Sequence, residues 1–131
     1  MPQKPVELIL MQQLASCLAV PMLLLDPAGN VVFYNEAAER LVGRRFEETG
    51  EISRAEWVAV FTPVSEHGAT IPLDSLPLAI ALRERRASHL AFRFRSLGGQ
   101  VRQIEETAFP LEGQGGRFVG AVAMIWEGSA Q

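Results

Sequence analysis

The sequence predicts an α+β fold, in which short helices cover one face of an antiparallel five-stranded sheet and an amphipathic helix precedes it. Three observations support this prediction. The order of patterns along the chain is helix, two strands, three short helical segments and three strands. Tight turns join the strands within both β blocks, which favours antiparallel pairing. The 131 residues, 48% of them hydrophobic, are enough for one domain with its own core.

The composition disfavours several classes of protein. The chain has 12 Lys+Arg and 15 Asp+Glu, a net charge of −3, which is too balanced to indicate direct nucleic-acid binding. Its apolar stretches reach about ten residues, short of the ~20 that a membrane-spanning helix needs. The N-terminus has no secretory-signal pattern, and the single cysteine, Cys17, cannot form an internal disulfide. We therefore expect a soluble, cytoplasmic protein without a membrane partner.

The first helix is predicted over Val6–Ala19, after a flexible lead-in at residues 1–5. This stretch contains neither Gly nor Pro, and its polar residues Gln12, Gln13 and Ser16 share one stripe. Pro21 ends the helix, because a residue before proline disfavours the α conformation. The apolar side is unusually wide and contains Leu8, Met11, Leu14, Ala15 and Leu18.

A hairpin and two capped helices follow. The segment Asp26-Pro27-Ala28-Gly29 has type I turn chemistry and separates apolar runs at 22–25 and 30–34. Asn35 is the predicted N-cap of a helix over Glu36–Val42, which Gly43 ends. Ser53 and Glu56 have the spacing of a capping box, so a second short helix is expected to run to about Phe61.

The rest of the chain predicts one more helix and three strands. Asp74 is the expected cap of a helix over Ser75–Arg86. Alternation predicts a strand over Leu90–Arg95, a Gly98-Gly99 turn, and a return strand over Val101–Leu111, whose uneven parity suggests a bulge. The last strand, Phe118–Trp126, is apolar in both phases, so both of its faces must be covered. The N-terminal helix is the available second cover.

This order of elements, with these residues at the joints, resembles a PAS domain. The resemblance rests on the hairpin with its Asp26-x-x-Gly29 turn and on Asn35-x-Ala37-Ala38 in a helix that ends with Leu41-x-Gly43. Residues 68–79, 108–111 and 120–122 resemble later parts of the family pattern. The match covers residues 6–127, with 20–127 as the PAS core, 6–19 as a dimerisation helix and 128–131 as a tail.

The resemblance implies a sheet in the order 2-1-5-4-3 with a small-molecule pocket beneath its helices. It also implies a sensory or dimerising role in bacterial signal transduction or transcription regulation. Many members end the last strand with Asp-x-Thr, which couples them to an effector, whereas here Trp126 is followed by Glu127-Gly128-Ser129. The expected effector is therefore a domain or protein outside this chain.

The sequence disfavours the family's coloured cofactors. Cys17 is not in the Asn-Cys-Arg motif of the flavin-binding branch and is expected to be a buried structural residue. The helix over 75–86, where haem-binding members place their proximal ligand, has no histidine; His67 and His89 lie elsewhere. No cluster has metal-ligand spacing, and no motif of an enzyme is present. We therefore expect no metal, no catalytic residue and no enzyme activity.

Two charged regions allow more than one interpretation. Six arginines, at 83, 85, 86, 93, 95 and 102, accompany one acid, Glu84, and could receive a phosphate or an acidic partner. The simpler interpretation is a solvated face balanced by Glu105 and Glu106 on the neighbouring strand. Arg44 and Arg45 raise the same question, and Glu47, Glu48 and Glu51 are expected in an exposed loop.

The predicted function is binding of a small, mostly apolar ligand by a sensory module that signals through a homodimer. The alternative is a ligand-free homodimerisation or protein-interaction module. The predicted pocket residues are Leu24, Leu41, Trp57, Phe61, Leu78, Leu82, Phe92, Phe94, Val122 and Met124. The predicted dimer interface consists of Leu8, Met11, Leu14, Ala15, Leu18, Val119, Ala121, Ala123 and Ile125.

Overall fold

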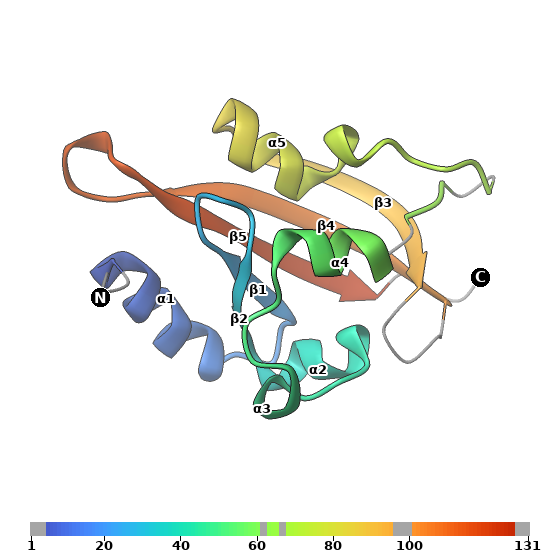
Figure 1. Ribbon diagram of the computed structural model, residues 1–131, viewed down its shortest axis with the longest axis horizontal. Helices are drawn as coiled ribbons and strands as arrows, with labels where there is room; N and C mark the ends of the chain where they lie inside the picture. The colour runs from blue at the N-terminus through green and yellow to red at the C-terminus, as the bar shows by residue number, and fades with distance from the viewer. Residues whose placement is uncertain (1–4, 61–62, 66–67, 96–100, 128–131) are drawn as a thin grey trace.

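The computed structural model describes residues 5–60, 63–65, 68–95 and 101–127. In these residues one antiparallel sheet has the strand order β2-β1-β5-β4-β3, as the resemblance implied (Figure 1). The strands are β1 (Met22–Leu25), β2 (Val31–Tyr34), β3 (Ser88–Arg95), β4 (Val101–Glu112) and β5 (Phe118–Glu127). The predicted turn at Gly98-Gly99 lies outside the described residues.

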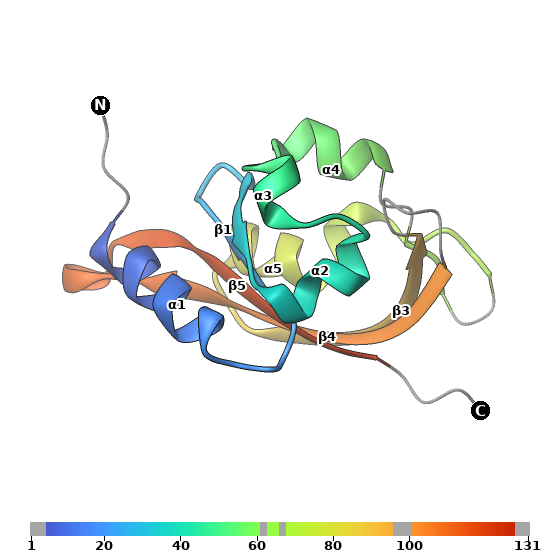
Figure 2. The same cartoon turned by 90° about the horizontal axis from the view of Figure 1, so that it is seen from below.

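The helices lie on both faces of the sheet. Figure 2 shows α1 on one side and the group α2 to α5 on the other. Because both faces are covered, the strands that are apolar in both phases, β1 and β5, are buried throughout most of their length. The helices are α1 (Val6–Ser16), α2 (Glu36–Val42), α3 (Phe46–Thr49), α4 (Arg54–Val60), η1 (Leu73–Ser75), α5 (Pro77–Glu84) and η2 (Gln114–Gly116).

Asn35 joins three elements at the end of β2. Its Oδ1 accepts hydrogen bonds from the backbone N–H of Ala38, which confirms the predicted N-cap of α2, and of Met22 in β1, both at 3.0 Å. Its Nδ2 donates to the carbonyl oxygens of Ala15 (2.8 Å) and Val20 (2.9 Å). The side chain is buried, and these bonds satisfy both ends of its amide. Asn35 therefore fixes the C-terminal end of α1 against the sheet.

The other helix ends agree with the prediction only in part. The Ser53–Glu56 capping box is confirmed by reciprocal hydrogen bonds of 3.1 and 3.2 Å. Asp74, by contrast, is not a helix cap: it lies in η1 and forms an ion pair with Arg83 at 2.9 Å. The helix α5 begins two positions after Ser75, at Pro77, because proline fits the first helical turn, where no intrahelical N–H partner is needed. Helix α1 ends at Ser16 rather than Ala19.

The two faces of β5 are the reverse of those predicted. Ala121, Ala123 and Ile125 belong to the core beneath α2 to α5, whereas Val122 and Met124 face α1. Pairing of Val122 with Leu24 in β1 places both residues on the α1 side. The alternation of residue types could not show which side chains of β5 face α1, because β5 is apolar in both phases.

The uneven parity of β4 has a different cause from the one predicted. Its pairing with β3 runs without interruption from Ser88–Ala108 to Arg95–Val101, and the register with β5 shifts only at Leu111/Glu112. The inward positions of its middle part are Ile104, Glu106 and Ala108, all buried. A carboxylate thus occupies one core position of this strand, which hides the apolar alternation.

Candidate functional site

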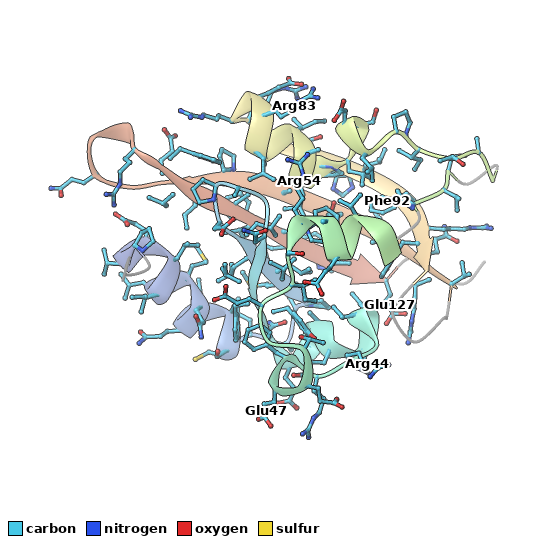
Figure 3. All side chains as sticks on the ribbon, in the orientation of Figure 1. Arg44, Glu47, Arg54, Arg83, Phe92 and Glu127 are labelled. Atoms are coloured by element: carbon cyan, nitrogen blue, oxygen red, sulfur yellow. The ribbon has the colours of Figure 1, made fainter. Side chains whose placement is uncertain are left out.

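A cavity of about 70 Å³ lies between the sheet and the helices on the α2 to α5 side. Of the described residues that line it, all but one are apolar, and they come from both layers. Five predicted pocket residues are among them: Leu41, Trp57, Leu78, Phe92 and Phe94. Phe92 of β3 is one of the labelled residues in Figure 3. The other lining residues are Leu23, Val31, Val42, Pro63, Leu73, Leu76, Ile104, Glu106 and Ile125.

The remaining predicted pocket residues lie elsewhere. Leu82 is half-buried against the same core without lining the cavity. Leu24, Val122 and Met124 are on the opposite face, packed in the cluster that includes α1. Their placement corrects the prediction. Both β1 and β5 are apolar in both phases, so the sequence pattern does not show which of their side chains face α2 to α5. Phe61 lies outside the described residues.

The cavity roof is tied to the sheet at two places. The indole N–H of Trp57 in α4 donates to the carbonyl of Gly29 in the first hairpin turn at 2.8 Å. After α4, Val64 exchanges two backbone hydrogen bonds, of 2.8 and 2.9 Å, with Arg93 of β3. Pro63, which lines the cavity, is therefore held beside the sheet edge by its neighbour. These contacts keep the cavity walls in place without filling the cavity.

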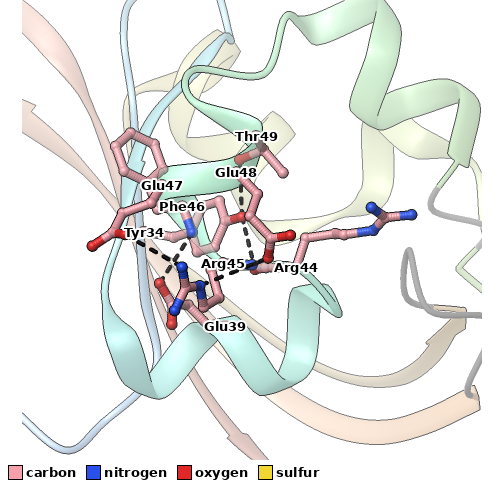
Figure 4. A network of polar contacts seen from close by, with 8 residues as sticks. All are labelled: Tyr34, Glu39, Arg44, Arg45, Phe46, Glu47, Glu48 and Thr49. Atoms are coloured by element: carbon pink, nitrogen blue, oxygen red, sulfur yellow. Dashed lines mark hydrogen bonds and ion pairs between the residues drawn. The ribbon is translucent and has the colours of Figure 1, made fainter.

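The link between α2 and α3 is also held to the sheet by side-chain contacts (Figure 4). The Tyr34 hydroxyl donates to the carbonyl of Arg44 at 2.9 Å and lies 3.0 Å from the Thr49 hydroxyl. The Phe46 ring packs edge-on against Tyr34, with centroids 5.2 Å apart. Burial raises the pKa of Tyr34 above its ordinary value of 10.0, so its hydroxyl keeps its proton at neutral pH. The segment from α2 to α3 is thus anchored to β2.

The charged residues of this link pair with one another. Arg45 contacts Glu47 at 3.4 Å and Glu48 at 3.8 Å, and all three side chains are exposed (Figure 4). Glu47 and Glu48 belong to α3 rather than to the predicted loop. Such exposed pairs contribute roughly 0–1 kcal/mol each, so they form a solvated surface of the domain.

Glu106 is the functional candidate that the sequence analysis missed. Its side chain is 5% exposed and lines the cavity from the middle of β4. Removal from water disfavours the charged form and raises the pKa of the carboxyl from its ordinary value of 4.5 to about 8. Its spacing from Ile104 and Ala108, two residues in either direction, was the available signal. Glu105, with which it was grouped, points outward instead, 3.2 Å from the imidazole of His89.

Most of the predicted dimer residues are covered within one chain. Leu8, Ala15, Val119, Ala121, Ala123 and Ile125 are buried. Met11 is half-buried against the sheet, and the exposed members of the set are Leu14 and Leu18, at 51% and 37% exposure. Helix α1 also exposes Val6, Ile9 and Leu10. Of the five predicted helix residues, Leu14 and Leu18 therefore belong to the outward apolar surface of the helix.

Cys17 and His89 have surface positions. Cys17 is the exposed C-cap residue of α1, so the expected buried position is wrong, and it does not line the cavity. The ring of His89 contacts Thr107 at 2.7 Å and Glu105 at 3.2 Å. Among the described residues no group of three or more His, Cys, Asp or Glu could hold a metal ion. His67 lies outside those residues.

The arginine-rich segment is balanced by other acids than those predicted. Arg83 pairs with Asp74 at 2.9 Å, and Arg86 with Glu84 at 2.8 Å. Arg102 pairs with Glu127 at 3.3 Å. Arg85 instead stacks on the ring of Phe118, at 4.8 Å from its centroid. Glu106 takes no part because it is buried.

In the part of the chain that the structure describes, no helix has the length and apolar character to cross a membrane.

The fold resembles several solved structures, two of them PAS domains and one a LOV protein, all at low sequence identity. The PAS domain of a Colwellia psychrerythraea protein has a TM-score of 0.65 at 16% identity, covering 95% of this chain and 98% of its own. The PAS domain of BvgS from Bordetella pertussis has a TM-score of 0.64 at 14% identity, with coverages of 95% and 88%. A LOV protein of Rhodobacter sphaeroides reaches 0.70 at 12% identity, with coverages of 96% and 70%.

Sequence comparison identifies the family independently of these structures. No curated protein matches the chain. A family model described as "PAS domain" matches residues 10–77, just over half of the chain, from α1 to the start of α5. This segment contains the Asn35 cap, the Ser53–Glu56 capping box and much of the cavity wall. With the strand order that the fold shows, it establishes that the chain belongs to the PAS domain family of signalling sensor modules.

Proposed function

We propose that this PAS domain is a sensory module that binds a small, mostly apolar molecule in the cavity beneath α2 to α5 and signals through a homodimer. The observation that carries the proposal is the cavity itself: apolar side chains from both layers surround about 70 Å³ of space. Well-packed small domains contain few voids larger than a water molecule. A space of this size, with a roof tied to the turn and the sheet edge, fits a compact guest. A cytoplasmic location and the absence of catalysis remain predictions.

The cavity does not fit a flavin or a haem. Its volume is well below the roughly 300–1,000 Å³ of pockets that enclose drug-sized ligands. Cys17 is exposed at the end of α1, and the ring of His89 contacts side chains on the outer surface of β4. Neither residue can reach a group held in the cavity without a large rearrangement. The proposed guest is therefore a small organic molecule with few heavy atoms.

The proposal is tested on purified protein by native mass spectrometry, organic extraction and thermal shift with a panel of small apolar compounds. We expect a co-purified guest or a concentration-dependent rise in melting temperature. Leu78→Phe, which adds volume inside the cavity, is expected to abolish that rise. Leu82→Phe is the matched control on the same helix, because Leu82 packs against the core without lining the cavity. No guest and no thermal shift would remove the support for the proposal.

A ligand-free homodimerisation module is the second candidate, and α1 favours it. Five apolar side chains of the α1 region are at least 37% exposed: Val6, Ile9, Leu10, Leu14 and Leu18. An apolar helix surface of this kind suits a self-complementary contact with a second copy, as in two-fold dimers. Leu10→Glu with Leu14→Glu should give a monomer by light scattering, with an unchanged circular dichroism spectrum. A dimer that survives both substitutions would place the interface elsewhere.

A further inference from the structure

Among the described residues that line the cavity, Glu106 is the one with a polar side chain, and its position in the sheet is fixed. Glu106 stands in the middle of β4, between Leu90 of β3 and Ile125 of β5 in the register. Its carboxyl group is directed into the cavity, and the thirteen other described residues that line this cavity are apolar or aromatic. The strand holds it on both sides, so the group cannot reach bulk water without breaking the sheet.

The carboxyl group has no hydrogen-bond or ion-pair partner among the described residues. None of the other described residues that line the cavity is ionisable. Buried polar groups in native proteins are nearly always paired, so a buried carboxyl group that faces a cavity without a protein partner calls for a functional explanation. Because the pKa of Glu106 is raised to about 8, its carboxyl group is a neutral –COOH in most copies of the protein at neutral pH. In that state the group offers one donor and one acceptor side by side.

The charge of the guest follows from these surroundings. An anionic guest would be buried in an apolar cavity, and none of the described lining residues is a cation that could compensate its charge. A cationic guest would have to displace the proton of Glu106 and would bury two ions with no other described polar side chain around them. A neutral guest that presents an acceptor beside a donor pairs with –COOH as it stands, with two hydrogen bonds and no proton released.

We propose that the guest of this cavity is a compact apolar molecule that carries one neutral amide-like group, which pairs with the carboxyl group of Glu106. The inference rests on the proposed function, since it needs the cavity to be a binding site. It adds the chemistry of recognition: the hydrocarbon part of the guest contacts the apolar walls, and its amide or lactam group determines the orientation. It also predicts that carboxylate-bearing guests, such as fatty acids, do not bind with their head group in the cavity.

The test uses four isosteric probes: 2,3-dimethylbutane, isobutyramide, isobutyrate and isobutyramidinium. Their affinities for the full chain are measured by NMR chemical-shift titration near neutral pH. Glu106→Met removes the polar group at similar volume, and Glu106→Gln retains one donor and one acceptor. We expect Glu106→Met to weaken isobutyramide binding about tenfold or more, as the loss of two hydrogen bonds predicts, and Glu106→Gln to change it by less than about threefold.

The hydrocarbon separates the inference from the proposed function. We expect 2,3-dimethylbutane to bind the protein and Glu106→Met alike. Suppose that 2,3-dimethylbutane binds but the affinity for isobutyramide is the same in the unmodified protein and in Glu106→Met. The inference is then overturned and the cavity function stands. The same holds if isobutyramidinium or isobutyrate binds the unmodified protein more tightly than isobutyramide. If none of the probes binds, the hydrocarbon included, the binding function fails, and the inference fails with it.

Discussion

Replacing Glu106 with glutamine should change how the stability of this domain depends on pH. The native carboxyl group holds its proton up to about pH 8, because burial raises its pKa, whereas in the unfolded chain it ionises near 4.5. A raised native pKa gives stability that is present in full below pH 4.5. That stability is lost as the pH rises through the interval up to 8, because folding then has to take up a proton. Glutamine does not titrate, so the variant lacks this loss.

The size of the effect follows from the two pKa values. Each unit of difference corresponds to about 1.4 kcal/mol, so the interval from 4.5 to about 8 amounts to about 5 kcal/mol in all. At pH 7 the accumulated loss is about 3 kcal/mol. This is a large fraction of the ~5–15 kcal/mol by which domains of this kind are stable. The group is almost entirely buried, so solvent screening does not reduce these values appreciably.

Urea denaturation, followed by circular dichroism from about pH 5 to about pH 9, measures the difference directly. Relative to the unmodified protein, Glu106→Gln should gain free energy of unfolding as the pH rises and level off above pH 8. Glu105→Gln is the matched control on the adjacent, exposed position, and its difference should stay within about 1 kcal/mol throughout. Parallel curves for Glu106→Gln and the unmodified protein would show that the carboxyl group is hydrated, and would refute the reasoning.

Three further substitutions test the frame around the cavity. Asn35→Ala leaves several buried backbone groups unpaired and should lower the free energy of unfolding by about 2–4 kcal/mol in urea denaturation. Gly120→Ala should destabilise by about 3 kcal/mol or more, because a Cβ at its φ of +148° collides with a backbone oxygen of β1; Gly115→Ala, in open space, should cost only about 1 kcal/mol. Trp57→Phe removes the indole hydrogen bond to Gly29 and should cost about 1 kcal/mol, read from the thermal midpoint.

Local chemistry made much of the fold predictable. The Asn35 cap and the Ser53–Glu56 box act over three residues, so the sequence itself contains both partners of each interaction. The same holds for the turn at Asp26, whose Oδ1 accepts from the backbone N–H of Asn30. The sequence-based prediction was wrong where the local structure depends on residues farther along the chain. Asp74 is a residue type that often caps helices. In the structure it forms an ion pair with Arg83, nine residues later, and the helix begins at Pro77 instead.

The candidate site was harder to predict because it depends on which way strands face. In β5 both phases are apolar, so the pattern of the strand fits either direction, and Val122 and Met124 were assigned to the wrong face. In β4 a carboxylate interrupts the apolar alternation, and neighbouring charges made Glu105 and Glu106 look equivalent. Only the register shows that one of them pairs across the surface and the other enters the cavity.

The same alternation connects the cavity with the helix on the other face. Ile125 lines the cavity, while the adjacent residue of β5, Met124, packs in the cluster that includes α1. Because interiors are close-packed, a guest that displaces Ile125 displaces the backbone that also carries Met124. Helix α1 buries only Leu8 and Ala15 completely, so its position changes at lower cost than the pairing of the central strands. We therefore expect occupancy of the cavity to be felt first at α1, whose exposed apolar surface is available to a second copy.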